Sequence, residues 1–160
     1  MREKVKTRAD LRAIAAKAKT EGKKIVFTNG CFDLLHVGHL HVLREAKKLG
    51  DILVVALNSD GSVKRLKGVG RPIVPESERA ELIAALEMVD YVTLFDEPDP
   101  QNVIQELKPD VLAKGGDWAA DKIIGREFVE SYGGKVAVIG YLKDHSTTKI
   151  IDIIERMRKQ

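Results

Sequence analysis

The sequence predicts an α/β fold: a Rossmann-like, doubly wound parallel sheet of five strands with helices on both of its faces. The first observation is a series of short Val-, Ile- and Leu-rich runs bounded by turn residues, the pattern of strands buried on both faces. The second is that helical segments alternate with these runs, which implies right-handed crossovers. The third is that no repeat, low-complexity tract or linker divides the chain, so residues 1–160 are expected to form one domain.

Five apolar runs are the candidate strands. The first ends at Asn29-Gly30 and the second at Asn58-Ser59-Asp60-Gly61, both of which are typical turn sequences. Ligands of open parallel sheets bind beyond the carboxyl ends of the strands, so a site is expected in the loops that follow these runs. The runs cover residues 24–28, 52–57, 91–95, 111–113 and 136–139.

Helical periodicity predicts five helices between and around the strands. In the first helix Leu11 and Ala18 share one face, and Thr7 is placed to act as its N-cap. The last helix begins with a Ser-Thr-Thr cap and continues with an apolar face from Ile150 to Ile154. The predicted helices cover residues 8–20, 38–48, 76–88, 101–107 and 146–158.

Composition restricts the class of protein further. Apolar residues make up 44% and charged residues 32%, which excludes general disorder. A net charge of +3 is too small to indicate nucleic-acid binding, although it allows a local basic pocket. The lone Cys31 excludes an internal disulfide, the start of the chain has no signal-peptide pattern, and the run at 52–57 is too short to cross a bilayer. We therefore expect a cytoplasmic protein with no nucleic-acid or membrane partner.

Two common nucleotide-binding motifs are missing. Gly133-Gly134-Lys135 is followed by Val136, so the chain has no P-loop of the GxxxxGK[ST] type. The Gly-x-Gly at 68–70 does not lie between a strand and a helix, so a dinucleotide site is not indicated. A nucleotide would have to be bound by another motif.

The strongest signal is the segment 28–39, which leaves the first strand through a turn and begins a helix with His36-x-Gly38-His39. Backbone N–H groups at a helix start attract phosphate, and Gly38 has no Cβ to obstruct a polyphosphate. The two imidazoles are three residues apart, so they face the same side and can donate to phosphate oxygens. The pattern predicts a phosphate site that contains His36 and His39.

Two other interpretations of these histidines are weaker. They could be an ordinary capping and surface pair, but the preceding strand, the Asn-Gly turn and Gly38 argue for a site. A zinc site of Cys31, His36, His39 and His41 is also possible on residue type. His41 lies two residues from His39 and so points elsewhere on a helix, which disfavours it.

The segment from Asn29 to His39 resembles the HxGH signature of the nucleotidyltransferase superfamily, which includes the cytidylyltransferases. Ser146-Thr147-Thr148 is similar to the [ST]-[ST]-T motif that opens the last helix of that family. Arg71-Pro72 and the segment 114–118 (KGGDW) most resemble the adenylyltransferases that form ADP-heptose. The resemblance covers residues from about 24 to 155, and the helix at about 8–20 lies outside the signature.

This resemblance implies that the chain transfers AMP from ATP to D-glycero-D-manno-heptose 1-phosphate and releases pyrophosphate, as in lipopolysaccharide precursor biosynthesis. It also implies Mg²⁺ as cofactor and a homodimer. The implied catalytic residues are His36, His39 and Lys67, and no metal ligand is assigned. The implied nucleotide-binding residues are Thr28, Asn29, Gly30, Cys31, Phe32, Gly38, Lys114, Gly116, Asp117, Ser146, Thr147 and Thr148.

The sugar phosphate is expected to bind to Asp33, Arg71 and Arg79. The two arginines can grip a phosphate with two hydrogen bonds each, and an acceptor-only carboxylate suits sugar hydroxyls. Each assignment has a structural alternative: Arg79 could form a surface i,i+4 pair, Lys67 could be a solvated lysine, and Ser146 could be a helix cap only.

Two alternative functions remain. One is a cytidylyltransferase that acts on glycerol 3-phosphate or a similar alcohol phosphate, because the HxGH and Ser-Thr-Thr motifs do not distinguish it. The other is a nucleotide-binding module without turnover. The chain also departs from the family pattern at 141–145, where many relatives carry a glycine and some carry an arginine, and Lys143 or His145 could supply that charge.

Overall fold

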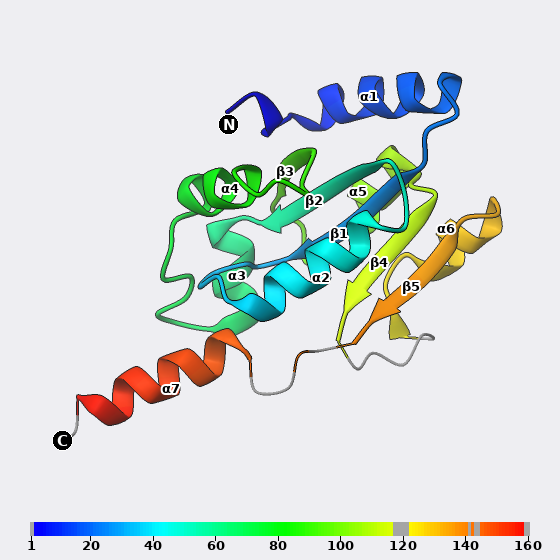
Figure 1. Cartoon of the computed structure of the whole chain (residues 1–160). Coiled ribbons are helices and arrows are strands. Elements are labelled where there is room, and N and C mark those ends of the chain that lie inside the picture. Colours follow the sequence, from blue (N-terminus) through cyan, green and yellow to red (C-terminus); the bar gives the residue numbers. More distant parts are fainter. Residues whose placement is uncertain (1, 117–121, 141, 143–144, 159–160) are drawn as a thin grey trace.

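The computed structural model describes residues 2–116, 122–140, 142 and 145–158. It contains a five-stranded sheet in the order β3-β2-β1-β4-β5, with every neighbouring pair parallel (Figure 1). The predicted α/β class and five-stranded parallel sheet are therefore confirmed. The strands are β1 (Ile25–Gly30), β2 (Ile52–Asn58), β3 (Tyr91–Phe95), β4 (Val111–Gly115) and β5 (Lys135–Ile139).

The helices connect these strands and cover both faces of the sheet. Alternate residues of a strand point to opposite faces, so Val26 packs with one apolar cluster and Phe27 with another. Residues of α2 and α4 belong to the cluster around Val26, whereas residues of α1, α5 and α6 belong to the cluster around Phe27. The helices are η1 (Arg2–Lys4), α1 (Arg8–Thr20), α2 (Val37–Lys47), α3 (Asp60–Lys67), α4 (Glu76–Ala84), α5 (Gln101–Leu107), α6 (Arg126–Ser131) and α7 (Thr147–Met157).

The strand order places a topological switch between β1 and β4. The chain builds outward from β1 to β2 and β3, and then returns to the other side of β1 to form β4 and β5. Loops leaving β1 and β4 therefore diverge to opposite faces, and the crevice between them is where open α/β sheets bind ligands.

Two helices differ from the prediction. The expected turn at 58–61 holds the end of β2, the N-cap Ser59 and the first two residues of α3, and Lys67 is the last residue of that helix. The Ser59 side chain caps α3 by accepting from the Ser62 N–H at 3.0 Å, and only two of its eight residues are buried, which is why no apolar periodicity announced it. The short helix α6 has a single buried residue, Val129, and is missed for the same reason.

The last helix forms as predicted, but its apolar face does not enter the core. None of the residues of α7 is buried, and Ile153, Ile154 and Met157 are 48%, 50% and 69% exposed. Figure 1 shows α7 projecting away from the sheet, with its first turn nearest to the rest of the chain.

Candidate functional site

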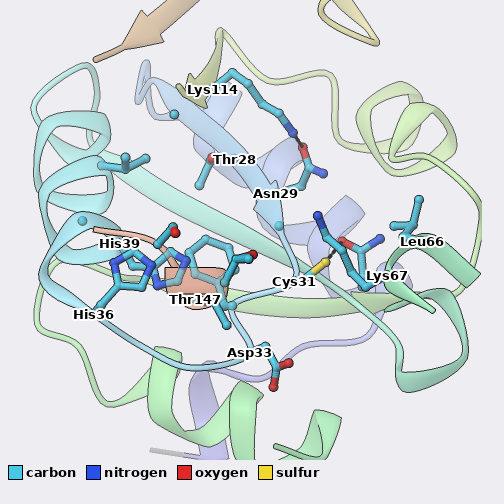
Figure 2. A pocket seen from close by; sticks show the side chains of 18 of the residues that line it. Thr28, Asn29, Cys31, Asp33, His36, His39, Leu66, Lys67, Lys114 and Thr147 are labelled. Atoms are coloured by element: carbon cyan, nitrogen blue, oxygen red, sulfur yellow. Dashed lines mark hydrogen bonds between the residues drawn. The ribbon is translucent and has the colours of Figure 1, made fainter. Parts of the chain in front are cut away.

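A cavity of about 960 Å³ lies at the carboxyl ends of the strands. Its walls come from the segments that follow β1, β2, β3 and β4, and from the first turn of α7. The predicted catalytic residues His36, His39 and Lys67 line it (Figure 2). So do the predicted nucleotide-binding residues Thr28, Asn29, Gly30, Cys31, Phe32, Gly38, Lys114, Ser146, Thr147 and Thr148.

The two histidines form a stacked pair at the start of α2. Their ring centroids are 3.8 Å apart with an interplanar angle of 27°, and the Phe32 ring lies 5.0 Å from that of His39. His36 occupies the N-cap position in an extended conformation, yet its side chain makes no capping hydrogen bond. The capping interpretation of His36 is therefore wrong.

The two ring nitrogens of each histidine differ in their surroundings. The Nδ1 atoms of His36 and His39 are sealed from solvent and have no hydrogen-bond partner among the described residues. Since neither has an acceptor for a proton at Nδ1, the neutral tautomer with the proton on Nε2 is favoured. Each ring then presents one N–H donor to the cavity.

The surroundings keep both rings neutral. Burial lowers the pKa of His39 to about 4, with the neighbouring His36 as the smaller cause. Burial also lowers the pKa of His36, helped by the charge of His145. At neutral pH the pair is therefore uncharged in the free protein, and a bound polyanion would favour its protonation.

Gly38 is needed for the histidine pair itself. A Cβ at this position would lie 2.9 Å from Cε1 and Nδ1 of His36 and 3.3 Å from Cβ of His145. Real Cβ contacts are essentially never as short as the first of these, so any other residue would require the His36 ring to shift. The space expected for a polyphosphate is thus occupied by an imidazole.

The first turn of α7 faces this pair. The Ser146 hydroxyl accepts from the Lys149 N–H at 3.1 Å as an N-cap, and the Thr147 hydroxyl donates to the Leu34 carbonyl at 3.1 Å. The second bond ties α7 to the loop after β1. Figure 2 shows Thr147 beside the two histidines, so the amide end of the helix opens onto the same part of the cavity.

Lys114 spans the topological switch. It comes from β4, and its Nζ donates to Oδ1 of Asn29 at the end of β1 over 3.1 Å (Figure 2). Burial lowers the pKa of Lys114. Thr28, also on β1, is nearly fully buried beneath this pair. An amine is therefore built into the floor of the crevice.

Lys67 and Arg71 bring positive charge to the other side of the cavity. Lys67 lines it from the end of α3, and Arg71 from the segment between α3 and α4. The Nε of Arg71 donates to Oδ2 of Asp33 at 2.6 Å, and its side chain is 16% exposed. Two cations next to a set of N–H donors suit a ligand with several phosphate groups.

Asp33 does not offer its carboxylate to a sugar. It is nearly completely buried; Oδ2 accepts from Arg71, and Oδ1 accepts from the N–H groups of Ile73 and Val74 at 2.8 and 2.9 Å. Burial alone would raise the pKa of Asp33, but the bonds from Val74, Arg71 and Ile73 together lower it. The prediction that Asp33 contacts sugar hydroxyls is therefore corrected: its oxygens are occupied by the protein.

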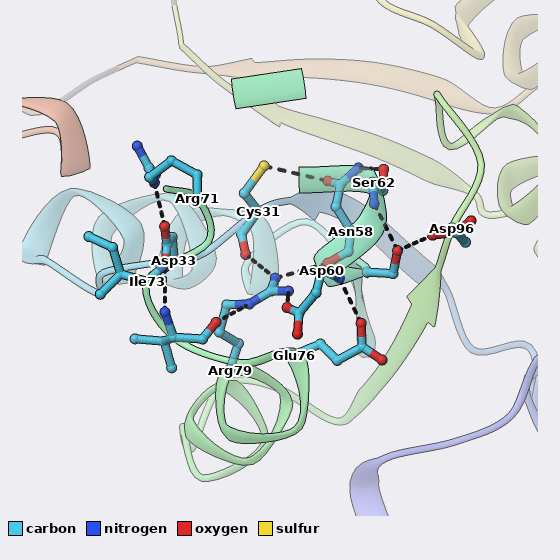
Figure 3. Close-up of polar contacts among 12 residues, drawn as sticks. Cys31, Asp33, Asn58, Asp60, Ser62, Arg71, Ile73, Glu76, Arg79 and Asp96 are labelled. Carbon is cyan, nitrogen blue, oxygen red and sulfur yellow. Dashed lines mark hydrogen bonds and ion pairs between the residues drawn. The ribbon is translucent and has the colours of Figure 1, made fainter. Parts of the chain in front are cut away.

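Arg79 does not line the cavity. It is completely buried, and its guanidinium donates to the carbonyls of Val74, Cys31 and Asn58 and to Oδ1 of Asp60 (Figure 3). These four contacts measure 2.9, 2.6, 2.9 and 2.7 Å. Both the predicted phosphate contact and the alternative surface pair are wrong for Arg79, which instead joins four segments near the cavity.

Two predicted nucleotide-binding residues that follow β4, Gly116 and Asp117, are not among the described residues that line the cavity. The Gly116 N–H donates to the Ile139 carbonyl at 2.9 Å, and Gly115 lines the cavity in its place. Asp117, like Trp118 and Lys143, lies outside the described residues.

Several lining residues were missed by the prediction, although they follow strands as the fold rule requires. Asn58 ends β2, and its Oδ1 accepts from the Cys31 thiol over 3.8 Å. Burial raises the pKa of that thiol, in keeping with a packed side chain. The others include Leu66, Pro98, Asp99, Pro100, Ile124 and Leu142, and Val42 and Lys149 line the cavity from the helices α2 and α7.

Metal ligands do not gather in the described part of the chain. No group of three or more His, Cys, Asp or Glu side chains there could hold a metal ion. Nor is any described helix long and apolar enough to cross a membrane.

The fold and the site together define an α/β enzyme class that binds a nucleotide at the switch point of its sheet. Residues 27–156 match the model of the cytidylyltransferase-like family, so the chain belongs to that family. It is a nucleotidyltransferase.

The relatives extend this assignment. The bifunctional protein HldE of Geobacter sulfurreducens is 53% identical over 151 residues, which is 94% of this chain and 31% of that protein. HldE of Alcanivorax borkumensis is 49% identical and covers 98% of this chain and 32% of that protein. The chain thus spans about a third of the length of these relatives.

Two solved structures are similar in fold. The lipopolysaccharide core biosynthesis protein of Thermoplasma volcanium has a TM-score of 0.64 and 35% identity, covering 78% of this chain and all of that one. Pantoate-beta-alanine ligase of Francisella tularensis has a TM-score of 0.60 at 16% identity, covering 98% of this chain and 79% of that one, and shares the fold alone.

Proposed function

We propose that this chain transfers AMP from ATP to D-glycero-D-manno-heptose 1-phosphate and produces ADP-heptose and pyrophosphate. The observation that carries the proposal is the stacked His36–His39 pair facing the start of α7 across a cavity that also holds Lys67 and Arg71. The relatives named HldE and the similar lipopolysaccharide core biosynthesis protein support a heptose phosphate, a precursor of lipopolysaccharide, as the acceptor.

The transfer needs no covalent enzyme intermediate, because the attacking phosphate is already an anion. One of its oxygens forms a bond to the α-phosphorus of ATP, and the bond from that phosphorus to the bridging β-oxygen breaks as pyrophosphate leaves. The Nε2–H groups of His36 and His39 would donate to the phosphate oxygens on which charge accumulates. Catalysis is then positioning and electrostatic stabilisation.

The remaining pocket groups divide between donor and acceptor. The triphosphate would extend to the first turn of α7, where Thr148 and the helix amides are available. The nucleoside would lie over Lys114 and Asn29 at the switch between β1 and β4. The sugar phosphate would meet Lys67 and Arg71.

Mg²⁺ would enter with the nucleotide. Mg²⁺ at such sites is bound through one or two carboxylates together with substrate phosphates and waters. Of the carboxylates that line the cavity in the described chain, Asp33 is fully hydrogen-bonded within the protein, so Asp99 is the one left to contribute. The ion supplies charge neutralisation of the leaving pyrophosphate when bound.

The substrates are tested by measuring pyrophosphate release with each of the four nucleoside triphosphates. The acceptors are heptose 1-phosphate, mannose 1-phosphate and glycerol 3-phosphate. We expect turnover with ATP and heptose 1-phosphate. Turnover with CTP and glycerol 3-phosphate instead would establish the cytidylyltransferase alternative, and nucleotide binding without pyrophosphate formation would establish a binding module.

The role of the histidines is tested by His36→Ala and His39→Ala, with His41→Ala as the matched control on the same helix. Losing one oxyanion donor typically costs about 10²–10³ in kcat, whereas His41 does not line the cavity. Undiminished turnover of His36→Ala would end the assignment.

We also propose that the chain is a cytoplasmic homodimer whose only other partners are its small-molecule substrates. The half-buried Ile150 and the exposed Ile153, Ile154 and Met157 follow i, i+3, i+4, i+7 spacing on α7, and a second copy can cover this stripe isologously. Light scattering of the wild type and of Ile154→Asp tests this. A wild-type monomer at all concentrations would exclude the dimer.

A further inference from the structure

The cavity wall between α3 and α4 is a segment without regular secondary structure, residues 68–75. It carries Arg71, which lines the cavity. A flexible arginine on an irregular segment would hold a phosphate poorly unless something fixed both the segment and the side chain. Figure 3 shows what fixes them: a network of polar contacts beneath the wall.

Asp33 is the centre of the part of this network that reaches Arg71. One oxygen accepts from the backbone of Ile73 and Val74, which fixes the segment, and the other accepts from Nε of Arg71, which fixes the side chain. The Asp33 side chain is 1% exposed, so none of this is available to a substrate. A single buried carboxylate thus sets both the backbone and the guanidinium.

The way Arg71 is held leaves its binding edge available. Asp33 occupies only the Nε–H, and the two terminal nitrogens have no hydrogen-bond partner among the described residues. These two nitrogens form the fork that grips a phosphate with parallel hydrogen bonds. The charge of Asp33 also stays close to the guanidinium without competing for that fork.

We infer that Asp33 is a positioning residue for the acceptor phosphate and acts through Arg71. This inference rests on the proposed function, since it concerns the sugar-phosphate end of the same cavity. The Asp33 carboxylate bonds to Arg71, Ile73 and Val74, all in the wall at the acceptor end, and the histidine pair and α7 stand at the nucleotide end. Asp33 is therefore expected to affect the acceptor selectively.

Asp33→Asn separates the two functions of the carboxylate. The amide oxygen still accepts from Ile73 and Val74, but the amide nitrogen now faces the Nε–H of Arg71, and two donors cannot bond. We expect the KM for heptose 1-phosphate to rise about tenfold while the KM for ATP stays within about twofold of wild type. Equal rises in both KM values, or no change in either, would overturn the inference.

A double-mutant cycle tests whether Asp33 acts through Arg71. In the Arg71→Ala background, Asp33→Asn should change the acceptor KM by less than about twofold, because the group it positions is gone. Fully additive effects would mean that Asp33 acts by another route, and the inference would fail.

Asp90→Asn is the matched control. Asp90 also joins a cation and a backbone amide, Lys47 Nζ at 2.5 Å and Leu53 N at 2.7 Å, but at the amino end of β3, away from the cavity. Like Asp33→Asn, it replaces a carboxylate that pairs with a cation and accepts from a backbone amide, although this pair is about a third exposed, and it should leave the acceptor KM at its wild-type value. A KM change of equal size in Asp90→Asn would show that general loosening explains the Asp33 result.

Binding separates this inference from the proposed function. The same cycle is run by isothermal titration calorimetry with mannose 1-phosphate and no nucleotide. A wild type that binds the sugar phosphate more tightly than Asp33→Asn, but transfers no nucleotide, would refute the function and support the positioning role. Equal binding by the two proteins, or none by the wild type, would refute the positioning role whatever the turnover.

Discussion

Replacing Arg79 should lower the free energy of unfolding, and any effect on substrate binding should be secondary. In Arg79→Met the long apolar stem is preserved, but four hydrogen bonds to Val74, Cys31, Asn58 and Asp60 are removed. Leaving the completely buried Asn58 carbonyl without its donor costs about 1–3 kcal/mol. The two partly buried carbonyls add about 1 kcal/mol each, and Asp60 is 43% exposed and can be hydrated. The expected loss is about 3–5 kcal/mol.

The measurement is urea unfolding of the wild type and the variant, followed by circular dichroism. Arg126→Met is the control, because Arg126 forms an exposed i,i+4 pair with Glu130, worth about 0.3–0.5 kcal/mol. Arg79→Lys should recover little of the stability, since one ammonium group cannot reach four acceptors. A loss below about 1 kcal/mol, no larger than the control's, would refute the reasoning and reopen a direct contact with the substrate.

The histidine pair and α3 lead to three more expectations. Because the pKa of His39 is about 4 in the folded protein against 6.5 for an ordinary histidine, the unfolded chain binds more protons below pH 6.5, so the free energy of unfolding should fall between about pH 6.5 and 4. Urea titrations across this range should show a smaller slope for His39→Gln; an unchanged slope would contradict the low pKa. Gly38→Ala should lower kcat in the pyrophosphate assay, because its Cβ would displace His36, and a crystal structure of the variant with the stack intact would argue against this. Lys67→Ala should lower kcat/KM by about 10–100-fold, whereas Lys64→Ala on the same helix should change it less than about twofold; equal effects would mean that only the charge of the helix matters.

The sheet and the edge that carries the site could be predicted because their signals are local. Buried parallel strands need continuous apolar runs, and the runs that end at Asn29 and Asn58 became β1 and β2. The HxGH segment also follows a strand, so the general rule for open sheets placed it at the correct edge. The helices that escaped prediction are those with little apolar surface: α3 buries only Ser62 and Val63.

The functions of the charged residues could not be read in the same way. Asp33, Arg71 and Arg79 were all candidates for the sugar phosphate on residue type. Only Arg71 both lines the cavity and keeps its terminal nitrogens without a hydrogen-bond partner among the described residues. A charged side chain is left for a ligand only when no other part of the protein pairs with it. Such a partner can be far away in the sequence: Arg71, which pairs with Asp33, lies 38 residues from it. No local pattern encodes that partnership, so it requires the tertiary structure.

The histidine pair shows why a low pKa and a role at a phosphate site are compatible. A cationic imidazole would need a partner for each N–H, but Nδ1 of both rings is sealed without one among the described residues, so the second proton is costly in the free protein. A neutral ring still donates through Nε2, and a donor held in place by stacking and by the absence of a Cβ at Gly38 needs no rearrangement as charge builds on a phosphate. The site therefore gains its stabilising power from fixed orientation, with the charge supplied by Lys67 and Arg71 on the opposite wall. Protonated histidines would attract any anion, whether substrate or product. Neutral donors with a fixed orientation instead stabilise the phosphate oxygen on which charge develops during transfer.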